Sequence, residues 1–242
     1  MPGFLALVGG DEFKPGNEEQ DRLLVAVSIR GPAYVIPTAA ARQGPDQAVA
    51  NAVRWFGGLG LRLDQLPILK RSDAMNPELA ARAEEGGLFY LVGGDPGLVA
   101  QVLRGSRVLA SILIAWRAGA AVAGSSAGAM ALCSQTLVRA TWPNRFRRRA
   151  IDALGVVPRA AVLPHYDTFG HRWVESAREA LPAHTLIGID ERSAAVCFGD
   201  GRTWRAMGPG AVTVIKGKRT ARFLSGAEVK GLPQLARMLP PP

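Results

Sequence analysis

The sequence predicts an α/β fold with a mostly parallel sheet and helices on both faces of that sheet. Short apolar runs that end at glycine-rich turns alternate with longer segments of helical character, which is the pattern of strands joined by crossover helices. Residues 88–92 are apolar at every position, as expected for a parallel strand buried on both faces. The 242 residues, 48% of them hydrophobic, can bury a full core. Since no composition shift marks a boundary, we expect one domain over residues 1–242.

The first half of the chain is predicted to alternate strand and helix. Strands are expected at residues 4–8, at 33–38, within 61–69 and at 88–92, because each run is apolar and bounded by turn residues. A helix is expected at 44–56, where Pro45 lies in the first turn, and another at 76–85, which two glycines close. Residues 18–27 have a polar start and an apolar finish, a pattern that fits a helix or a strand.

The second half continues this order and then changes. Helices at 97–103 and 107–118 precede residues 120–133, which are typical of a strand, a tight turn and a helix. Residues 141–149 are expected to form a loop over the mouth of a site, 156–163 a strand, and 169–181 a helix. Short runs at 185–190, 193–198, 203–207, 211–215 and 220–224 predict an antiparallel β meander, and 232–239 a last helix.

Charge and cysteine content narrow the class of protein. The net charge of +9 comes largely from scattered arginines, with one dense cluster from Arg145 to Arg149 that we interpret as a surface feature near a site entrance, with no nucleic acid expected. Cys133 and Cys197 lack any C-x-x-C spacing, so we expect two buried free thiols and a reducing compartment. The apolar N-terminal run is short and follows no basic region, which predicts a cytoplasmic protein without membrane attachment.

Ser126 is the first candidate for chemistry. It lies at the centre of the run Gly-Ser-Ser-Ala-Gly at residues 124–128, a G-x-S-x-G pattern in which small residues permit a strained turn that presents the hydroxyl. The following helix would offer free backbone N–H groups to an oxyanion formed beside that hydroxyl. A glycine- and alanine-rich turn that only tightens the packing of strand against helix would look similar.

His165 is the candidate base for this serine. A serine needs a base to accept its proton, and the base needs a third group that holds its tautomer. The chain has three histidines, and His165 ends a predicted strand, where open α/β sheets form their sites. His171 and His184 flank the next predicted helix and are expected on the surface.

Four segments, in this order, resemble the peptidase E and cyanophycinase family of serine peptidases. They are Leu-Val-Gly-Gly-Asp-Pro at residues 91–96, Gly-Ser-Ser-Ala-Gly-Ala at 124–129, Leu-Pro-His-Tyr-Asp at 163–167 and Gly-Ile-Asp-Glu at 188–191. The resemblance implies a glutamine amidotransferase-like fold. It also implies a serine peptidase that uses no metal or organic cofactor, is a monomer or homodimer, and cleaves small peptides after an aspartyl or isoaspartyl residue.

The resemblance also assigns roles to residues. It makes Ser126 the nucleophile and His165 the general base and later the general acid, with the backbone N–H groups of Gly94 and Ala127 as the oxyanion hole. Peptidase E has an aspartate as third member at the position that is Thr141 here, whereas cyanophycinase has a glutamate that corresponds to Glu191. We therefore expect Glu191 as the third member, with Asp190 and Asp167 as rivals.

Asp95 is a candidate substrate-binding residue. Peptidase E has asparagine at this position, and the aspartate here resembles cyanophycinase. A carboxylate would repel an aspartyl side chain and attract an amine or a guanidinium, unless a nearby arginine compensates. Asp95 could equally cap the helix that starts near Gly97.

Two other functions are compatible with parts of the sequence. An esterase of the α/β-hydrolase kind has its acid between the serine and the histidine, and no suitable strand carries an acid between Ser126 and His165. A non-catalytic amidotransferase-like domain could bind a small ligand or a partner through the Arg145–Arg149 segment. The presence of a serine, a histidine and a candidate acid disfavours it.

Overall fold

The structure is a computed structural model that describes residues 2–28, 31–139 and 147–235. Its strands are β1 (Leu5–Val8), β2 (Ala33–Ile36), β3 (Leu63–Gln65), β4 (Leu88–Leu91), β5 (Ala121–Ser125), β6 (Gln135–Arg139), β7 (Arg148–Asp152), β8 (Ala160–Leu163), β9 (Thr185–Ile189), β10 (Ala194–Cys197), β11 (Trp204–Met207), β12 (Ala211–Lys216) and β13 (Arg219–Leu224). Its helices are α1 (Glu18–Val27), α2 (Pro45–Gly58), α3 (Arg71–Ala74), α4 (Pro77–Glu84), α5 (Pro96–Leu103), α6 (Arg107–Arg117), α7 (Ala127–Leu132) and α8 (Val174–Ala180), with 3₁₀ turns η1 (Thr38–Ala40) and η2 (Gly170–Trp173).

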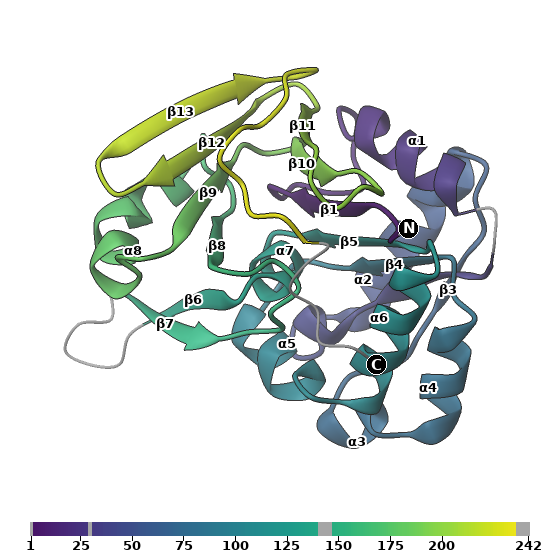
Figure 1. Cartoon of the computed structure of the whole chain (residues 1–242). Helices are drawn as coiled ribbons and strands as arrows, with labels where there is room; N and C mark the ends of the chain where they lie inside the picture. The colour runs from purple at the N-terminus through teal and green to yellow at the C-terminus, as the bar shows by residue number, and fades with distance from the viewer. Residues whose placement is uncertain (1, 29–30, 140–146, 236–242) are drawn as a thin grey trace.

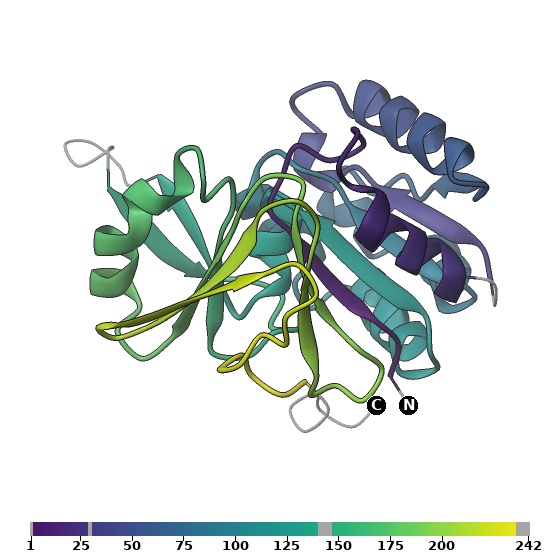
Figure 2. The ribbon, with the colours of Figure 1, turned by 90° about the horizontal axis from the view of Figure 1, so that it is seen from above.

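The described strands form three sheets. The main sheet has seven strands in the order β11-β10-β1-β5-β4-β2-β3, in which the strands from β1 to β3 are parallel. A second sheet has the order β13-β12-β9-β8, and β6 pairs with β7 in a separate hairpin. The second sheet and the hairpin lie to one side of the main sheet, as the two views show (Figures 1 and 2).

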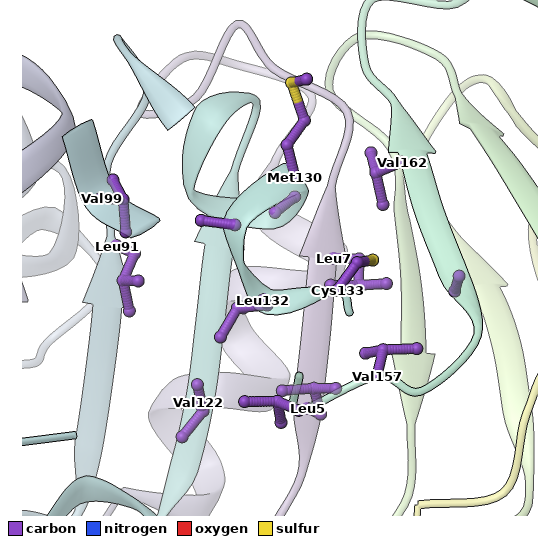
Figure 3. Packing of buried hydrophobic residues seen from close by; sticks show 14 of the residues in the cluster. Leu5, Leu7, Leu91, Val99, Val122, Met130, Leu132, Cys133, Val157 and Val162 are labelled. Atoms are coloured by element: carbon purple, nitrogen blue, oxygen red, sulfur yellow. The ribbon is translucent and has the colours of Figure 1, made fainter. Parts of the chain in front are cut away.

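Helices cover both faces of the main sheet, as the sequence predicts. Alternate strand residues belong to two separate apolar clusters, because successive side chains of a strand point to opposite faces. Leu24 of α1 and Phe56 of α2 pack on one face with Ala6 and Val8 of β1. Helices α4 to α7 pack on the other face, where Met130 and Leu132 of α7 lie among residues of β1, β5 and β8 (Figure 3). Helix α7 is thus enclosed between the two sheets.

The predicted antiparallel region is present, but its strands divide between two sheets. Strands β9, β12 and β13 are antiparallel neighbours in the second sheet. Strands β10 and β11 instead extend the main sheet beyond β1. Strand β8, which ends just before His165, pairs in parallel with β9 and therefore belongs to the second sheet.

Other differences from the predicted elements are local. The loop expected at residues 141–149 has Arg148 and Arg149 in strand β7, and residues 141–146 lie outside the described part of the chain. Residues 18–27 form a helix, and residues 169–181 divide into η2 and α8. The helix expected at 232–239 falls largely outside the described residues, and 232–235 are not helical.

Asp21 gives the fold an unusual dependence on pH. Asp21 is a buried residue of α1, and its carboxyl group accepts a hydrogen bond from Trp55 Nε1 at 2.8 Å. Burial raises the pKa of Asp21 from 3.8 to about 7, so the folded state holds a proton that the unfolded chain releases at lower pH. The resulting stabilisation is complete below the unfolded pKa and is lost as the pH rises through the folded pKa.

We therefore expect Asp21→Asn to gain in relative stability as the pH rises. Between pH 5 and pH 8 the free energy of unfolding of the wild type should fall by about 2–3 kcal/mol relative to that of the variant. Urea unfolding at the two pH values measures this difference, with Asp64→Asn, whose side chain is 46% exposed, as the matched control. A constant difference between wild type and Asp21→Asn would contradict the raised pKa.

Candidate active site

Ser126 lies in the tight turn between β5 and α7. Its backbone has φ 47° and ψ −108°, a conformation that few residues other than glycine adopt. The turn is held because Ser126 N donates to Val8 O at 3.0 Å and Met130 N to Ser126 O at 2.9 Å. A Cβ atom on Gly128 would lie 2.3 Å from the carbonyl oxygen of Leu91, so only glycine allows α7 to begin this close to β4.

His165 approaches Ser126 from the second sheet. It follows β8, and its backbone N–H donates to Gly9 O at 2.7 Å, which joins the second sheet to the end of β1. The ring places Nε2 3.1 Å from Ser126 Oγ and Nδ1 2.7 Å from Glu191 Oε1. The three side chains therefore form one chain of hydrogen bonds at the junction of the two sheets.

The contacts of the three candidate acids differ. Glu191, which follows β9, contacts His165 and also accepts a hydrogen bond from Thr168 Oγ1 at 3.3 Å. Asp167 accepts from the backbone N–H of Glu191 at 3.0 Å. Asp190 is buried and accepts from Ala211 N at 2.9 Å and Arg222 Nη2 at 3.2 Å. Glu191 thus contacts the imidazole, whereas Asp190 and Asp167 support the surrounding backbone.

Gly94 and Ala127 lie beside Ser126 as candidate oxyanion donors. Gly94 has φ 139°, and a Cβ atom there would lie 2.2 Å from Ala39 O, so this loop conformation requires glycine. Ala127 is the first residue of α7, where N–H groups have no intrahelical partner. Among the described residues, neither the Gly94 N–H nor the Ala127 N–H has a hydrogen-bond acceptor in a turn, loop or cap. Both N–H groups are therefore available to donate to an oxyanion.

Glu12 anchors this loop, and the sequence pattern gave no signal for it. Its Oε1 accepts from Gly93 N at 2.9 Å, and its Oε2 accepts from Ser125 Oγ at 2.8 Å. One carboxylate therefore ties the residue before Gly94 to the residue before Ser126. Burial, and then the charges of Asp21 and Glu12, raise the pKa of Tyr90. Glu12 is a candidate positioning residue, because it holds the backbone N–H of Gly93 and the side chain of Ser125, which are next to Gly94 and Ser126.

Replacing Glu12 with alanine should lower kcat/KM by about 10- to 100-fold, because Gly93 N–H loses its acceptor and the Gly94 donor is no longer held. The loss should fall mainly on kcat. Glu12→Gln keeps one carbonyl oxygen for Gly93 N–H and should recover most of the rate. Steady-state kinetics of both variants, with thermal unfolding to exclude global destabilisation, measure the effect. Equal rates for Glu12→Ala and wild type would show that the loop holds itself.

A cavity of about 660 Å³ opens beside Ser126. It is lined by residues of the segment before α2, the Gly94 loop, α5, the Ser126 turn with α7, the β6–β7 hairpin and the segment after β8: Gln43, Gly94, Asp95, Pro96, Ser126, Ala127, Met130, Leu137, Val138, Arg139, Arg148, Pro164, Phe169 and Trp173. Asp95 caps α5, since its Oδ1 accepts from Gly97 N at 2.9 Å and from Leu98 N at 3.1 Å. The capping interpretation of Asp95 is thus confirmed, and the same residue faces the cavity.

The remaining histidines lie apart from Ser126. His171 is exposed as predicted, with Nδ1 2.9 Å from Tyr166 O, whereas His184 is half-buried rather than on the surface. Within the described ranges, no group of three His, Cys, Asp or Glu side chains could hold a metal ion. No single helix of the described chain is long and apolar enough to span a membrane. Helices α5 and α6 reach the required length and composition only as a pair, which is bent by 93°.

Comparison with known proteins places this chain in a family. The sequence model of peptidase family S51 matches residues 5–203. The chain belongs to peptidase family S51. It is 28% identical to the cyanophycinases of Synechococcus elongatus and Thermosynechococcus vestitus over 167 residues, which are 66% of this chain and 51% of each relative. The chain thus spans about half the length of these curated relatives.

A solved structure supports the same assignment to family S51. A peptidase from an acI-B1 Actinobacterium is 31% identical and superposes with a TM-score of 0.83, covering 95% of this chain and 97% of that one. The resemblance to the peptidase E and cyanophycinase family, drawn from four short segments, is therefore confirmed.

Proposed function

We propose that this S51 family member is a serine peptidase that cleaves an amide bond through an acyl-enzyme intermediate. The observation that carries the proposal is the hydrogen-bonded chain from Ser126 through His165 to Glu191 beside an open cavity. Ser126 Oγ attacks the scissile carbonyl carbon as His165 Nε2 accepts its proton. The N–H groups of Gly94 and Ala127 then stabilise the oxyanion, each by roughly 3 kcal/mol.

The second half of the reaction uses the same residues. His165 gives its proton to the leaving amine, and the C–N bond breaks to leave the acyl group on Ser126. Water then attacks the ester carbonyl carbon while His165 accepts a proton from it, and His165 returns that proton to Ser126 Oγ as the ester C–O bond breaks and the acid product leaves. Glu191 keeps the Nδ1 proton of the imidazole in place and balances the positive charge that the ring acquires.

The substrate we propose is a small peptide cleaved after an aspartyl or isoaspartyl residue, by a dipeptidase or other exopeptidase activity. Three features of the chain support this proposal. The relatives named above are cyanophycinases. The cavity has the size of a small-ligand site. Its walls carry a carboxylate at Asp95 and guanidinium groups at Arg139 and Arg148, so that a zwitterionic peptide finds opposite charges at both ends.

The cellular setting belongs to the same proposal. Cys133 and Cys197 are buried free thiols, and burial raises the pKa of each to about 12, so neither is a reactive thiolate. Free thiols fit a cytoplasmic protein. We propose a monomer or homodimer with one domain that acts on peptides rather than on nucleic acid or at a membrane.

Amino acid release from a dipeptide panel tests this function. The panel pairs Asp-Leu with Asn-Leu and β-Asp-Arg with β-Asp-Leu, and includes Leu-Leu as a neutral control. Labelling with a fluorophosphonate, followed by intact-mass measurement, tests the nucleophile independently of the substrate. We expect one phosphonyl group per chain and hydrolysis of the aspartyl or isoaspartyl members. A protein that is neither labelled nor active would favour the non-catalytic binding domain.

A further inference from the structure

The β6–β7 hairpin places two arginines side by side at the wall of the cavity. Arg139 and Arg148 are direct cross-strand partners, and both line the cavity that contains Ser126. Like charges directly opposite each other destabilise a β hairpin. Burial, and then the charge of Arg139, lower the pKa of Arg148. The stability of the hairpin therefore does not explain this pair of cations. Binding of an anion between the two arginines would explain it.

Neighbouring arginines have acidic partners that Arg148 lacks. Arg147 pairs with Glu179 at 3.1 Å, and Arg104 pairs with Asp152 at 3.0 Å. Arg148 has no ion pair among the described residues, and its Nε is buried without a hydrogen-bond partner there. Glu179 and Asp152 thus pair with other arginines, and no described acid forms an ion pair with Arg148.

An aromatic row holds Arg148 in place and connects it with the catalytic base. Its guanidinium lies 4.0 Å from the centroid of the Trp173 ring, a cation–π contact. Trp173 contacts Phe169 at 5.4 Å between ring centroids, and Phe169 stacks on His165 at 4.8 Å. The row runs along one wall of the cavity, with the imidazole of His165 at one end and the guanidinium at the other. The hairpin lies beside α8, which follows this segment (Figure 1).

We propose that Arg148, stacked on Trp173 and flanked by Arg139, binds a carboxylate of the peptide substrate and is a specificity-determining residue of the cavity. A planar guanidinium pairs with a carboxylate through two parallel hydrogen bonds, and an indole ring that fixes its plane reduces the entropy lost on binding. The carboxylate comes either from the aspartyl side chain or from the free C-terminus of the peptide. This inference rests on the proposed peptidase function.

Matched substrates separate the two sources of the carboxylate. Asn-Leu lacks the side-chain carboxylate of Asp-Leu, and Asp-Leu amide lacks its C-terminal carboxylate. In Arg148→Met, kcat/KM for Asp-Leu should fall by about 10- to 100-fold. The variant and the wild type should then have equal rates on whichever analogue lacks the recognised carboxylate. Arg148→Lys keeps the charge without the planar fork and should be intermediate.

Arg149→Met is the control variant, because Arg149 is the next residue of β7, is exposed and does not line the cavity. It removes the same charge and should keep wild-type kinetics. The rate of fluorophosphonate labelling should be unchanged in Arg148→Met, since that reagent has no carboxylate. An equal loss on Asp-Leu and both analogues, no loss at all, or an equal loss in Arg149→Met would overturn the inference.

Binding measurements test this inference independently of the proposed peptidase activity. In the Ser126→Ala background, calorimetric titration with Asp-Leu, Asn-Leu and Asp-Leu amide should show weaker binding of one analogue, and addition of Arg148→Met should remove that preference. If wild type neither reacts with the phosphonate nor cleaves any peptide while this preference is present, the proposed activity fails and the carboxylate site stands. Binding of all three peptides with equal affinity would overturn the site.

Discussion

Replacing Ser126 with alanine is expected to abolish peptide hydrolysis, with kcat reduced by at least about 10⁴-fold. The Ser126 hydroxyl oxygen supplies the electron pair that forms the bond to the carbonyl carbon. Without this hydroxyl, His165 has no proton to accept. The fold should be unaffected, because the turn is held by backbone hydrogen bonds of Ser126 and not by its hydroxyl. Progress curves on the best dipeptide of the panel, together with circular dichroism and thermal unfolding, measure both expectations.

Ser72→Ala is the matched control, since Ser72 is exposed on the short helix α3. It should keep the wild-type rate and the fluorophosphonate label, whereas Ser126→Ala should lose both. If Ser126→Ala retained most of the activity, another residue would have to form the covalent intermediate, and the assignment of the nucleophile would be wrong. If Ser126→Ala were unfolded, Ser126→Cys, whose side chain is of similar size, would replace it, and the folded variant should likewise lose the fluorophosphonate label, since that reagent is selective for activated serine hydroxyls.

The main sheet was predictable because its strands carry an unmistakable pattern. Residues 88–92 are buried at every position, and no amphipathic surface element has such a continuous apolar run. The turn at Ser126 was equally visible, since the close approach of Gly128 to Leu91 O excludes every larger residue. In both places a short stretch of sequence reflects a strong steric or hydrophobic constraint.

The β6–β7 hairpin was not predicted because its residues are under weaker steric and hydrophobic constraints. Arg148 and Arg149 begin a strand whose residues are all half-buried or exposed. The division of the C-terminal strands between two sheets was equally hidden, because the partner of β10 is β1, far away in sequence. Pairing over such distances leaves no local signature.

Glu12 shows the same limit at the level of a single side chain. It follows a glycine-rich turn and looks like an ordinary loop carboxylate, yet it binds Gly93 N and Ser125 Oγ. These partners belong to two other segments, and only the three-dimensional arrangement of β1, β4 and β5 brings them together. Motif reasoning therefore identified the candidate reacting groups, whereas the groups that position them emerged from the structure.

Glu191→Gln is expected to reduce kcat by about 10³- to 10⁴-fold, the second largest loss among these variants. The carboxylate accepts the Nδ1 proton at 2.7 Å, and both side chains are largely shielded, with His165 20% and Glu191 23% exposed. A glutamine amide could offer its NH₂ group to Nδ1 instead, which would favour the tautomer with the proton on Nε2. That tautomer cannot accept the proton of Ser126.

The two rival acids supply the controls for this prediction. Asp167→Asn keeps an oxygen for Glu191 N–H, so its kcat should stay within about tenfold of the wild type. Asp190→Asn loses the charge that pairs with Arg222 while keeping an acceptor for Ala211 N, and it should affect the midpoint of thermal unfolding more than kcat. If Asp190→Asn or Asp167→Asn lost more activity than Glu191→Gln in folded protein, Glu191 would not be the residue that orients His165.

Because Thr168 Oγ1 also donates to Glu191 Oε1, Thr168→Val should cause a smaller loss of kcat than Glu191→Gln.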